Sequence, residues 1–264
     1  DFTPVVFSNI MLEVPMRVVK DDANIKESGK GWKILDGQED NDEEYIDTLK
    51  EAWSEGIQII CVDTDIKSFP EHLYIGTDNY EAGKMLGEEL INVTGGEANV
   101  AVISGEPGFS NLEERLEGLQ DAVKDYPKIH LGDVQYDNYD GLTVMKMYYQ
   151  NAKGADTIVF LEGTGGITIS SQFRQRDDQY EHILGFDAFF GVIGGVIDGI
   201  IKQDTRRMGE QVVEEIANYV RNGEYSSETV YTTTHWMTAE NYHSILSDAE
   251  LEYAQKWNSG GRTQ

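Results

Sequence analysis

Short apolar runs alternate with longer amphipathic segments along this chain. The runs are rich in Val and Ile and show little polar alternation, which is typical of strands buried on both faces of a parallel sheet. We therefore expect strands at 4–9, 32–37, 57–63, 99–105, 129–136, 157–162, 182–187 and 197–203.

Several segments between these runs show the periodicity of amphipathic helices. Apolar residues recur three or four positions apart in 79–92 and 111–125, so each segment has one apolar face. A third helix is expected at 206–223, where Gly223 is placed to end it. Strand–helix alternation predicts the α/β class with parallel sheets, and the two sets 1–76 and 79–200 predict two similar Rossmann-like lobes.

The charge balance excludes some partners. The chain has 264 residues, and 48 Asp and Glu against 21 Lys and Arg give a formal net charge of −27. That field repels phosphate backbones and anionic lipid headgroups, so nucleic acid and membrane surfaces are not expected partners. Cys61 is the one cysteine, which precludes an intrachain disulfide. The chain begins at Asp1 without Met, and we expect a mature or trimmed product from which any signal peptide has already been removed.

Polar side chains stand where the predicted strands end. Ligands of open parallel sheets bind outside the carboxyl ends of the strands. Carboxylates and amides that grip hydroxyls, an arginine as a forked donor and nearby aromatic faces favour a sugar or polyol site. The alternative is that these residues only make turns. The strand-end candidates are Ser8, Asn9, Asp36, Asp63, Thr64, Asp65, Ser104, Gly105, Glu106, Tyr136, Asp137, Glu162, Asp187 and Gln203, with Arg115 in a following helix and the aromatic residues Phe109, Tyr139, Phe189 and Phe190 nearby.

Catalytic motifs are not found in the sequence. "SGEPGFSN" lacks the Gly-Lys-Ser/Thr ending of a phosphate-binding loop, and Gly-x-Ser-x-Gly is absent. The five histidines have no metal-ligand spacing. Asp63 and Asp65 could serve a glycosidase, but many such carboxylate pairs are expected in a chain this acidic. We therefore expect no enzyme, no metal and no cofactor.

Several segments together resemble one family. They are "GIQIICVDTD", "YIGTDNYEAGKMLGEEL", "VAVISGEPGFSNLEERLEGLQDAV", "ILGFDA" and "IDGIIKQDTRRMGEQVVEEI". In this order they are similar to the ribose- and galactose-type periplasmic sugar-binding proteins, which have the type I solute-binding fold. The similarity runs over most of 57–245.

The resemblance implies two lobes joined by a three-strand hinge. Lobe one would be 1–76 plus 204–231, and lobe two would be 77–203. Residues 232–264 would hold the third hinge crossing and a C-terminal tail.

The resemblance also implies roles for the candidate residues. Asp63 would accept hydrogen bonds from sugar hydroxyls, and Arg115 would reach the ring oxygen or a hydroxyl. Asn9 would bind the sugar from lobe one. Asp187 and Gln203 would bind it from lobe two and the hinge. Three further positions match less closely: Tyr139 stands where an aromatic residue is common, Glu162 or Gly163 stands where Asn is usual, and Thr64 replaces the Arg of ribose-specific members.

One segment departs from the family pattern. Between "WKILDGQEDN" and "LKEAWSEGIQIICVDTD" the family has a further helix and strand, for which too few residues lie between Asn41 and Leu49. Loss of a central strand would leave backbone groups unpaired, which is costly. The unit is either deleted or absent from the sequence as given, and the second is expected.

The implied function is capture of a small sugar or polyol by two closing lobes, followed by delivery to an ABC-type permease. The chain would be extracytoplasmic, in the periplasm or lipid-anchored on the outer face of the cytoplasmic membrane, and monomeric. The alternatives are the sugar-sensing domain of a membrane receptor or kinase, or of a LacI-like regulator without its DNA-binding part.

Overall fold

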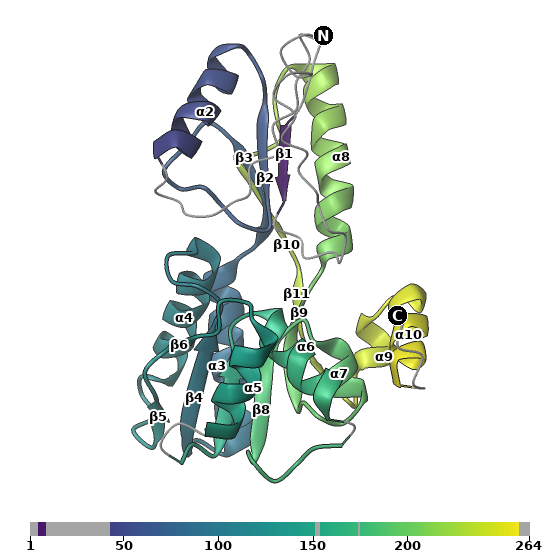
Figure 1. The fold of residues 1–264 in the computed structure, drawn as a ribbon. Helices are drawn as coiled ribbons and strands as arrows, with labels where there is room; N and C mark the ends of the chain where they lie inside the picture. The colour runs from purple at the N-terminus through teal and green to yellow at the C-terminus, as the bar shows by residue number, and fades with distance from the viewer. Residues whose placement is uncertain (1–4, 9–42, 151–153, 174, 259–264) are drawn as a thin grey trace. The chain divides into compact units, whose positions relative to one another are not determined.

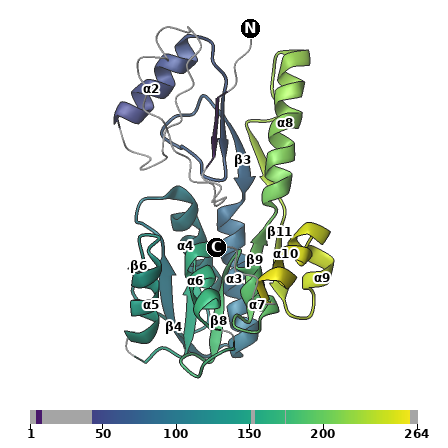
Figure 2. The ribbon, with the colours of Figure 1, turned by 45° about the vertical axis from the view of Figure 1, so that its right-hand side comes forward.

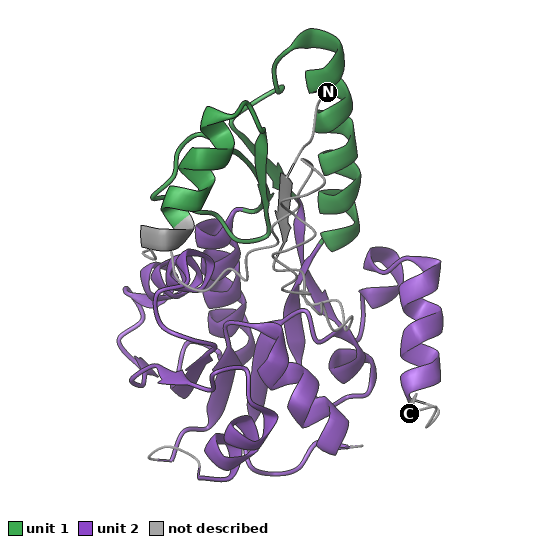
Figure 3. Ribbon diagram, turned by 45° about the horizontal axis from the view of Figure 1, so that its top comes forward, with its two compact units in different colours: residues 1–77, 204–232 green, residues 78–203, 233–264 purple. Residues whose placement is uncertain are grey.

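The chain forms two compact units. The structure is a computed structural model and describes residues 5–8, 43–150, 154–173 and 175–258. Unit 1 is Asp1–Thr77 with Asp204–Thr232, and unit 2 is Asp78–Gln203 with Thr233–Gln264 (Figure 3). No helix in these described ranges is long and apolar enough to cross a membrane.

Unit 1 is a parallel sheet between two helices. The sheet has the order β1-β2-β3-β10. Alternate residues of β2 face opposite sides: Ile59 packs with α2, whereas Ile60 packs with Met208 of α8. This two-sided burial explains the unbroken apolar run. The elements are β1 (Val5–Ser8), α2 (Glu43–Ser54), β2 (Ile59–Val62), β3 (Leu73–Thr77), α8 (Thr205–Asn222) and β10 (Thr229–Thr232) (Figure 1).

The segment of unit 1 that is shorter than in the family pattern lies between β1 and β2 in the sequence. β1 pairs directly with β2, from Val5 opposite Ile59 to Ser8 opposite Val62. These two strands therefore supply each other's backbone partners. The predicted strand 32–37 lies outside the described residues, whereas residues 43–48 of the shortened segment form the first part of α2.

Unit 2 has a larger sheet with the order β11-β9-β8-β7-β4-β5, and β6 also pairs with β4. Its pairs are parallel except for β11 against β9. The elements are α3 (Asn79–Thr94), β4 (Ala98–Ser104), α4 (Ser110–Val123), β5 (Ile129–Leu131), β6 (Gln135–Tyr136), α5 (Gly141–Gln150), β7 (Thr157–Phe160), α6 (Gly163–Gln172), β8 (His182–Phe186), α7 (Phe189–Ile193), β9 (Gly199–Gln203), β11 (Thr234–Thr238), α9 (Tyr242–Ile245) and α10 (Asp248–Asn258).

Helices cover both faces of the unit 2 sheet. On one face α3 and α4 pack Leu86 and Leu119 against Val102 and Val159. On the other face α5, α6 and α7 pack against Phe160 and its neighbours. The residues after Thr232, expected as a crossing and a tail, add β11, α9 and α10 to this unit, with α10 beside α7 (Figures 1 and 2).

The sequence prediction of an α/β fold with parallel sheets is confirmed. The expected strand 129–136 is two short strands, Ile129–Leu131 and Gln135–Tyr136, which are separated by residues 132–134 and both pair with β4. The strands that the sequence predicts do not include β10 and β11. Their threonines and exposed positions conceal the apolar pattern on which the prediction depended.

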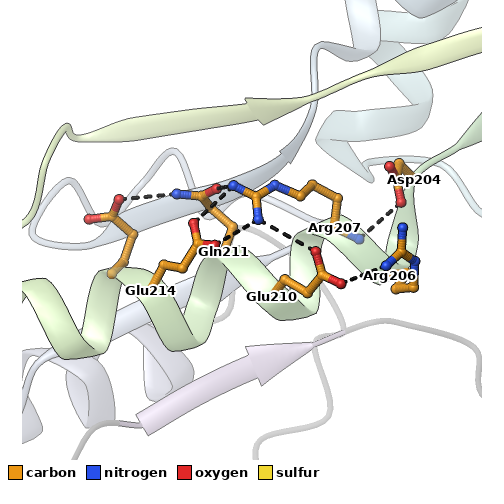
Figure 4. Close-up of polar contacts among 7 residues, drawn as sticks. Asp204, Arg206, Arg207, Glu210, Gln211 and Glu214 are labelled. Atoms are coloured by element: carbon orange, nitrogen blue, oxygen red, sulfur yellow. Dashed lines mark hydrogen bonds and ion pairs between the residues drawn. The ribbon is translucent and has the colours of Figure 1, made fainter.

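Helix α8 begins at Thr205, and Asp204 is its N-cap. The side chain of Asp204 caps it by accepting from Arg207 N at 2.9 Å. Charged pairs follow its exposed surface, with Arg206 bound to Glu210 and Arg207 to Glu214 (Figure 4). Exposed pairs of this kind add little stability, so the apolar face of α8 accounts for its place in unit 1.

Glycines allow α3 and α4 to approach each other closely. A methyl group at Gly118 would lie 2.1 Å from Tyr80 O, and one at Gly83 would lie 2.0 Å from Arg115 O. Both contacts involve backbone atoms, which cannot swing away. The position of Arg115 therefore depends on glycine on the facing helix.

We expect Gly118→Ala to destabilise the protein by about 1–3 kcal/mol, because the added methyl group pushes α3 and α4 apart. The matched control is Gly209→Ala in α8, where a methyl group meets nothing within 4 Å. Removing a helical glycine there should stabilise by about 0.5–1 kcal/mol. Urea unfolding of both variants measures the difference, and a similar stabilisation by both would contradict the packing.

Candidate functional site

Arg115 joins several elements of unit 2 at the carboxyl edge of its sheet. Its Nε donates to Asn79 Oδ1 at 3.0 Å, Nη1 to Leu161 O at 2.9 Å and Nη2 to Gln203 Oε1 at 2.9 Å. The guanidinium also lies 4.0 Å from the centroid of the Phe186 ring. Because only 3% of Arg115 is exposed, these partners replace the water that its charge would otherwise need.

Gln203 extends this contact to Asp187. Its Nε2 donates to Asp187 Oδ2 at 2.5 Å, and its backbone N donates to Asp187 Oδ1 at 3.1 Å. Asp187 follows β8 and has a left-handed backbone, with φ of 55°. Such a conformation is uncommon outside glycine and marks candidate functional positions. Arg115, Gln203 and Asp187 therefore form one network of donors and acceptors.

Two buried carboxyls lie near this network. Glu162 caps α6: its carboxylate accepts from Gly165 N at 2.8 Å and also from Thr164 N. Asp137 follows β6, is fully buried, and accepts from Tyr139 N at 2.8 Å through Oδ1. Burial, followed by the charge of Glu162, raises the pKa of Asp137 to about 8. Burial also raises the pKa of Glu162, against the opposing effect of the backbone N–H groups at the helix end.

Tyr139 stands in a tight turn beside these carboxyls. It has φ of 53°, and Asn138 before it has φ of 51°. A methyl group at Gly105 would lie 2.4 Å from Tyr139 Cζ, so the ring lies directly on the Gly105 backbone. The Phe109 ring meets it edge-on at 6.1 Å. The glycine therefore makes room for an aromatic face at the carboxyl edge, and burial raises the pKa of its phenol.

In unit 1, Asp63 and Thr64 follow β2. Asp63 has φ of 72°, and its backbone carbonyl accepts from Tyr74 Oη at 2.9 Å. Within the part of the chain that the structure describes, the buried Thr64 Oγ1 has no hydrogen-bond partner. These two residues thus occupy a constrained turn at the carboxyl end of their own sheet.

The Asp65 carboxylate, two residues after Asp63, is bound by His72. His72 Nε2 lies 2.7 Å from Asp65 Oδ1, and Nδ1 lies 2.5 Å from Phe69 O. Both partners accept hydrogen bonds, which favours a doubly protonated imidazolium. Burial alone would lower the pKa of His72, but its hydrogen bond to Asp65 outweighs this effect and raises the pKa to about 10.

The site residues predicted from the sequence lie in different parts of the structure. The structure links Arg115, Asp187 and Gln203 by hydrogen bonds and puts Glu162 and Tyr139 near Asp137, whereas Asp63 and Thr64 lie in unit 1. Asn9 lies outside the described residues. Asn79 and Phe186 are not among the residues that the sequence predicts for the site, and Asp137 is predicted there only as one of the polar residues at strand ends. Asn79 and Asp137 can be predicted as site residues, since each is a polar residue next to a strand end. Phe186 cannot, because its position in an apolar strand is typical of a core residue.

Metal binding has no candidate in the described residues: they contain no group of three or more His, Cys, Asp or Glu that could hold an ion. The edge of unit 2 instead offers fixed donors, acceptors and aromatic faces. Such an arrangement can bind a small hydroxylated molecule.

A model of one family matches the chain over residues 40–224, more than half of its length; that family is described as the periplasmic binding protein domain. No curated protein sequence matches the chain.

Solved structures also resemble this chain. An ABC transporter solute-binding protein from Burkholderia graminis, in complex with D-arabinose, is 25% identical, with a TM-score of 0.69 over 76% of this chain and 74% of that one. A glucose-galactose binding protein from Geobacillus stearothermophilus is 22% identical, with a TM-score of 0.67 over 75% and 73%. A galactofuranose binding protein is 16% identical, with a TM-score of 0.68 over 90% and 92%. All three share the fold.

We expect Arg115→Ala to destabilise the protein by about 3 kcal/mol, because it leaves the buried acceptors Asn79 Oδ1 and Leu161 O without this donor. Arg206→Ala is the control, since its side chain is exposed and its pair with Glu210 is at the surface. That change should shift the free energy of unfolding by less than about 0.5 kcal/mol. Urea unfolding compares them, and equal small effects would show that Arg115 is not needed by the fold.

We expect the stabilising contribution of His72 to depend on pH. Its pKa is raised from 6.5 to about 10, so its contribution is complete below pH 6.5 and is lost as pH rises through about 10. Urea unfolding at pH 6, 8 and 10 should show the stability of wild type falling relative to His72→Gln. A difference that stays constant with pH would indicate a neutral imidazole in the folded protein.

Proposed function

Since the chain belongs to the periplasmic binding protein family, whose domain model matches more than half of its length, we propose that it is a solute-binding protein that captures a small sugar or polyol. In this proposal Arg115, Asp187 and Gln203 bind ligand at the carboxyl edge of unit 2. Tyr139 supplies an aromatic face, and Glu162 adds an acceptor. Asp63 and Thr64 contribute from the carboxyl end of the unit 1 sheet, and Asn9 is proposed as a further contact.

The observation that carries the proposal is the Arg115–Gln203–Asp187 network. It fixes a forked cation, an amide and a carboxylate at neighbouring strand ends. Sugar hydroxyls both donate and accept hydrogen bonds, so they can use all three groups. Preorganised groups of this kind reduce the entropy lost when a ligand binds. The bound D-arabinose of the Burkholderia graminis protein supports the same ligand class.

The proposed partner is a membrane permease of the ABC class. The solute-binding protein from Burkholderia graminis is described as an ABC transporter component, which supports this assignment. The proposed location is extracytoplasmic, in the periplasm or on the outer face of the cytoplasmic membrane by a lipid anchor. Binding and delivery require no catalytic step, and we propose a non-enzymatic monomer that has no cofactor.

A thermal-shift panel of pentoses, hexoses and polyols, including D-arabinose, D-galactose and myo-inositol, tests the proposal. At 100 to 1,000 times its Kd, a ligand that binds the folded state should stabilise it by about 3–4 kcal/mol, which raises the Tm visibly. Titration calorimetry of each positive compound then gives its affinity. A folded sample that shows no shift with any of them would contradict the proposed ligand class.

Gly105→Ala then tests the site itself. Its methyl group should push the half-exposed Tyr139 ring off the backbone, and we expect affinity for the positive compound to fall by about tenfold. The unliganded Tm should change little, because the ring can swing outward. Gly209→Ala, in open space on α8, is the control and should leave the affinity unchanged.

A further inference from the structure

Asp137 is a fully buried carboxyl that lacks one of its hydrogen bonds. Its exposed fraction is 0%, and its Oδ1 accepts from Tyr139 N. Among the described residues, its buried Oδ2 has no partner with hydrogen-bond geometry. A buried carboxylate oxygen without a donor is costly, whereas a protonated carboxyl can itself donate to an acceptor nearby. The acceptor at hand is the Glu162 carboxylate, whose two helix N–H donors favour the ionised form.

The turn that Asp137 supports is strained. Asn138 and Tyr139 are consecutive non-glycine residues with positive φ, a conformation that costs about 1–3 kcal/mol for each residue where the surroundings must enforce it. The Asp137 side chain holds Tyr139 N, and its backbone carbonyl accepts from Asp140 N at 3.0 Å. Asp137 therefore fixes the turn that presents the Tyr139 ring.

We propose that Asp137 is a positioning residue for ligand binding: in its protonated form it joins the Glu162 carboxylate to the Tyr139 turn, and ligand affinity depends on this single shared proton. The inference rests on the proposed function, in which Tyr139 and Glu162 contact the ligand. When the proton is lost, two negative charges face each other in a buried place, and the turn must move to separate them.

The charged surroundings agree with one proton shared by the pair. Glu162 faces Asp137 from the start of α6, and Asp140 and Tyr139 face it from its own loop. Around Tyr139, Glu106 follows β4, and Arg115 of α4 is the cation. Among these groups the carboxylates outnumber the one cation, Arg115. A second negative charge on the Asp137–Glu162 pair would therefore have little nearby positive charge to offset it. Consistent with this, burial and Glu162 raise the pKa of Asp137 to about 8.

The sign of the pH dependence follows from linkage. The folded protein keeps the Asp137 proton up to about pH 8, whereas the unfolded chain loses it near 3.8. The unfolded state therefore binds fewer protons between these values, and stability falls as pH rises through that window. Asp137→Asn keeps an acceptor for Tyr139 N and a donor toward Glu162 but cannot ionise. Its Tm should exceed that of wild type by a margin that grows from pH 4 to pH 8 and then stays constant.

Two measurements without ligand test the proton and its link to the turn. The first is the Tm of wild type and Asp137→Asn from pH 4 to pH 9. The second is the NMR shift of the Tyr139 amide, which should titrate with a midpoint near pH 8 in wild type and stay constant in Asp137→Asn. A constant Tm difference together with an amide shift that does not titrate would overturn the inference.

Affinity measurements link the proton to binding. For a sugar found in the thermal-shift panel, wild-type affinity should fall by up to about tenfold between pH 8 and pH 9. Asp137→Asn should bind as wild type does at pH 6.5 and show no such loss, whereas Asp137→Ala should bind weakly throughout. If a sugar binds with equal pH profiles in wild type and Asp137→Asn, the inference fails and the proposed function stands. If the amide titrates but no sugar binds, the proposed function fails and the proton-sharing pair stands, without its role in ligand binding.

Discussion

Burial of the Arg115 charge is the constraint on which the unit 2 edge depends. A guanidinium that is 3% exposed requires acceptors at defined angles, and they come from separate elements: Asn79 at the start of α3, the carbonyl of Leu161 after β7 and Gln203 at the end of β9. Asn79 and Gln203 lie in regular elements, and Leu161 directly follows one, so the sheet edge holds the arginine in place and the arginine in turn links these elements. The hydrogen bonds that compensate the charge of Arg115 also hold its guanidinium in one orientation.

The close packing of α3 and α4 is what allows Arg115 to reach this position. Gly83 faces the carbonyl of Arg115, and Gly118 faces the carbonyl of Tyr80, with no room for a Cβ at either glycine. Packing between helices and hydrogen bonding at the strand ends are thus two parts of one arrangement. A change at the helix contact would displace a group that lies near the ends of three strands.

The sequence allowed prediction of the α/β class and most strands of the parallel sheets, because strands buried on both faces have unbroken apolar runs. It also allowed prediction of several polar residues at strand ends, since parallel strands bring their carboxyl ends to one edge. The contacts between residues within the site could not be predicted from the sequence in the same way. Phe186 looks like any core aromatic residue until Arg115 is placed over it, and the buried state of Asp137 depends on tertiary packing. Glu162 was considered as a ligand contact, but its local role as the cap of α6 emerges only from the fold.

The charge distribution explains why a neutral, hydroxyl-rich ligand suits the proposed site better than an anionic one. Arg115 is already surrounded by acceptors and lies on an aromatic ring, while Glu162 and Asp187 add carboxylates at the same edge. An anion would meet these carboxylates in a chain whose formal charge is −27. A sugar hydroxyl can donate to a carboxylate and accept from a guanidinium without bringing charge into a partly buried place. Its binding energy then comes from many oriented hydrogen bonds and an aromatic face, and so depends on how rigidly the strand ends hold those groups.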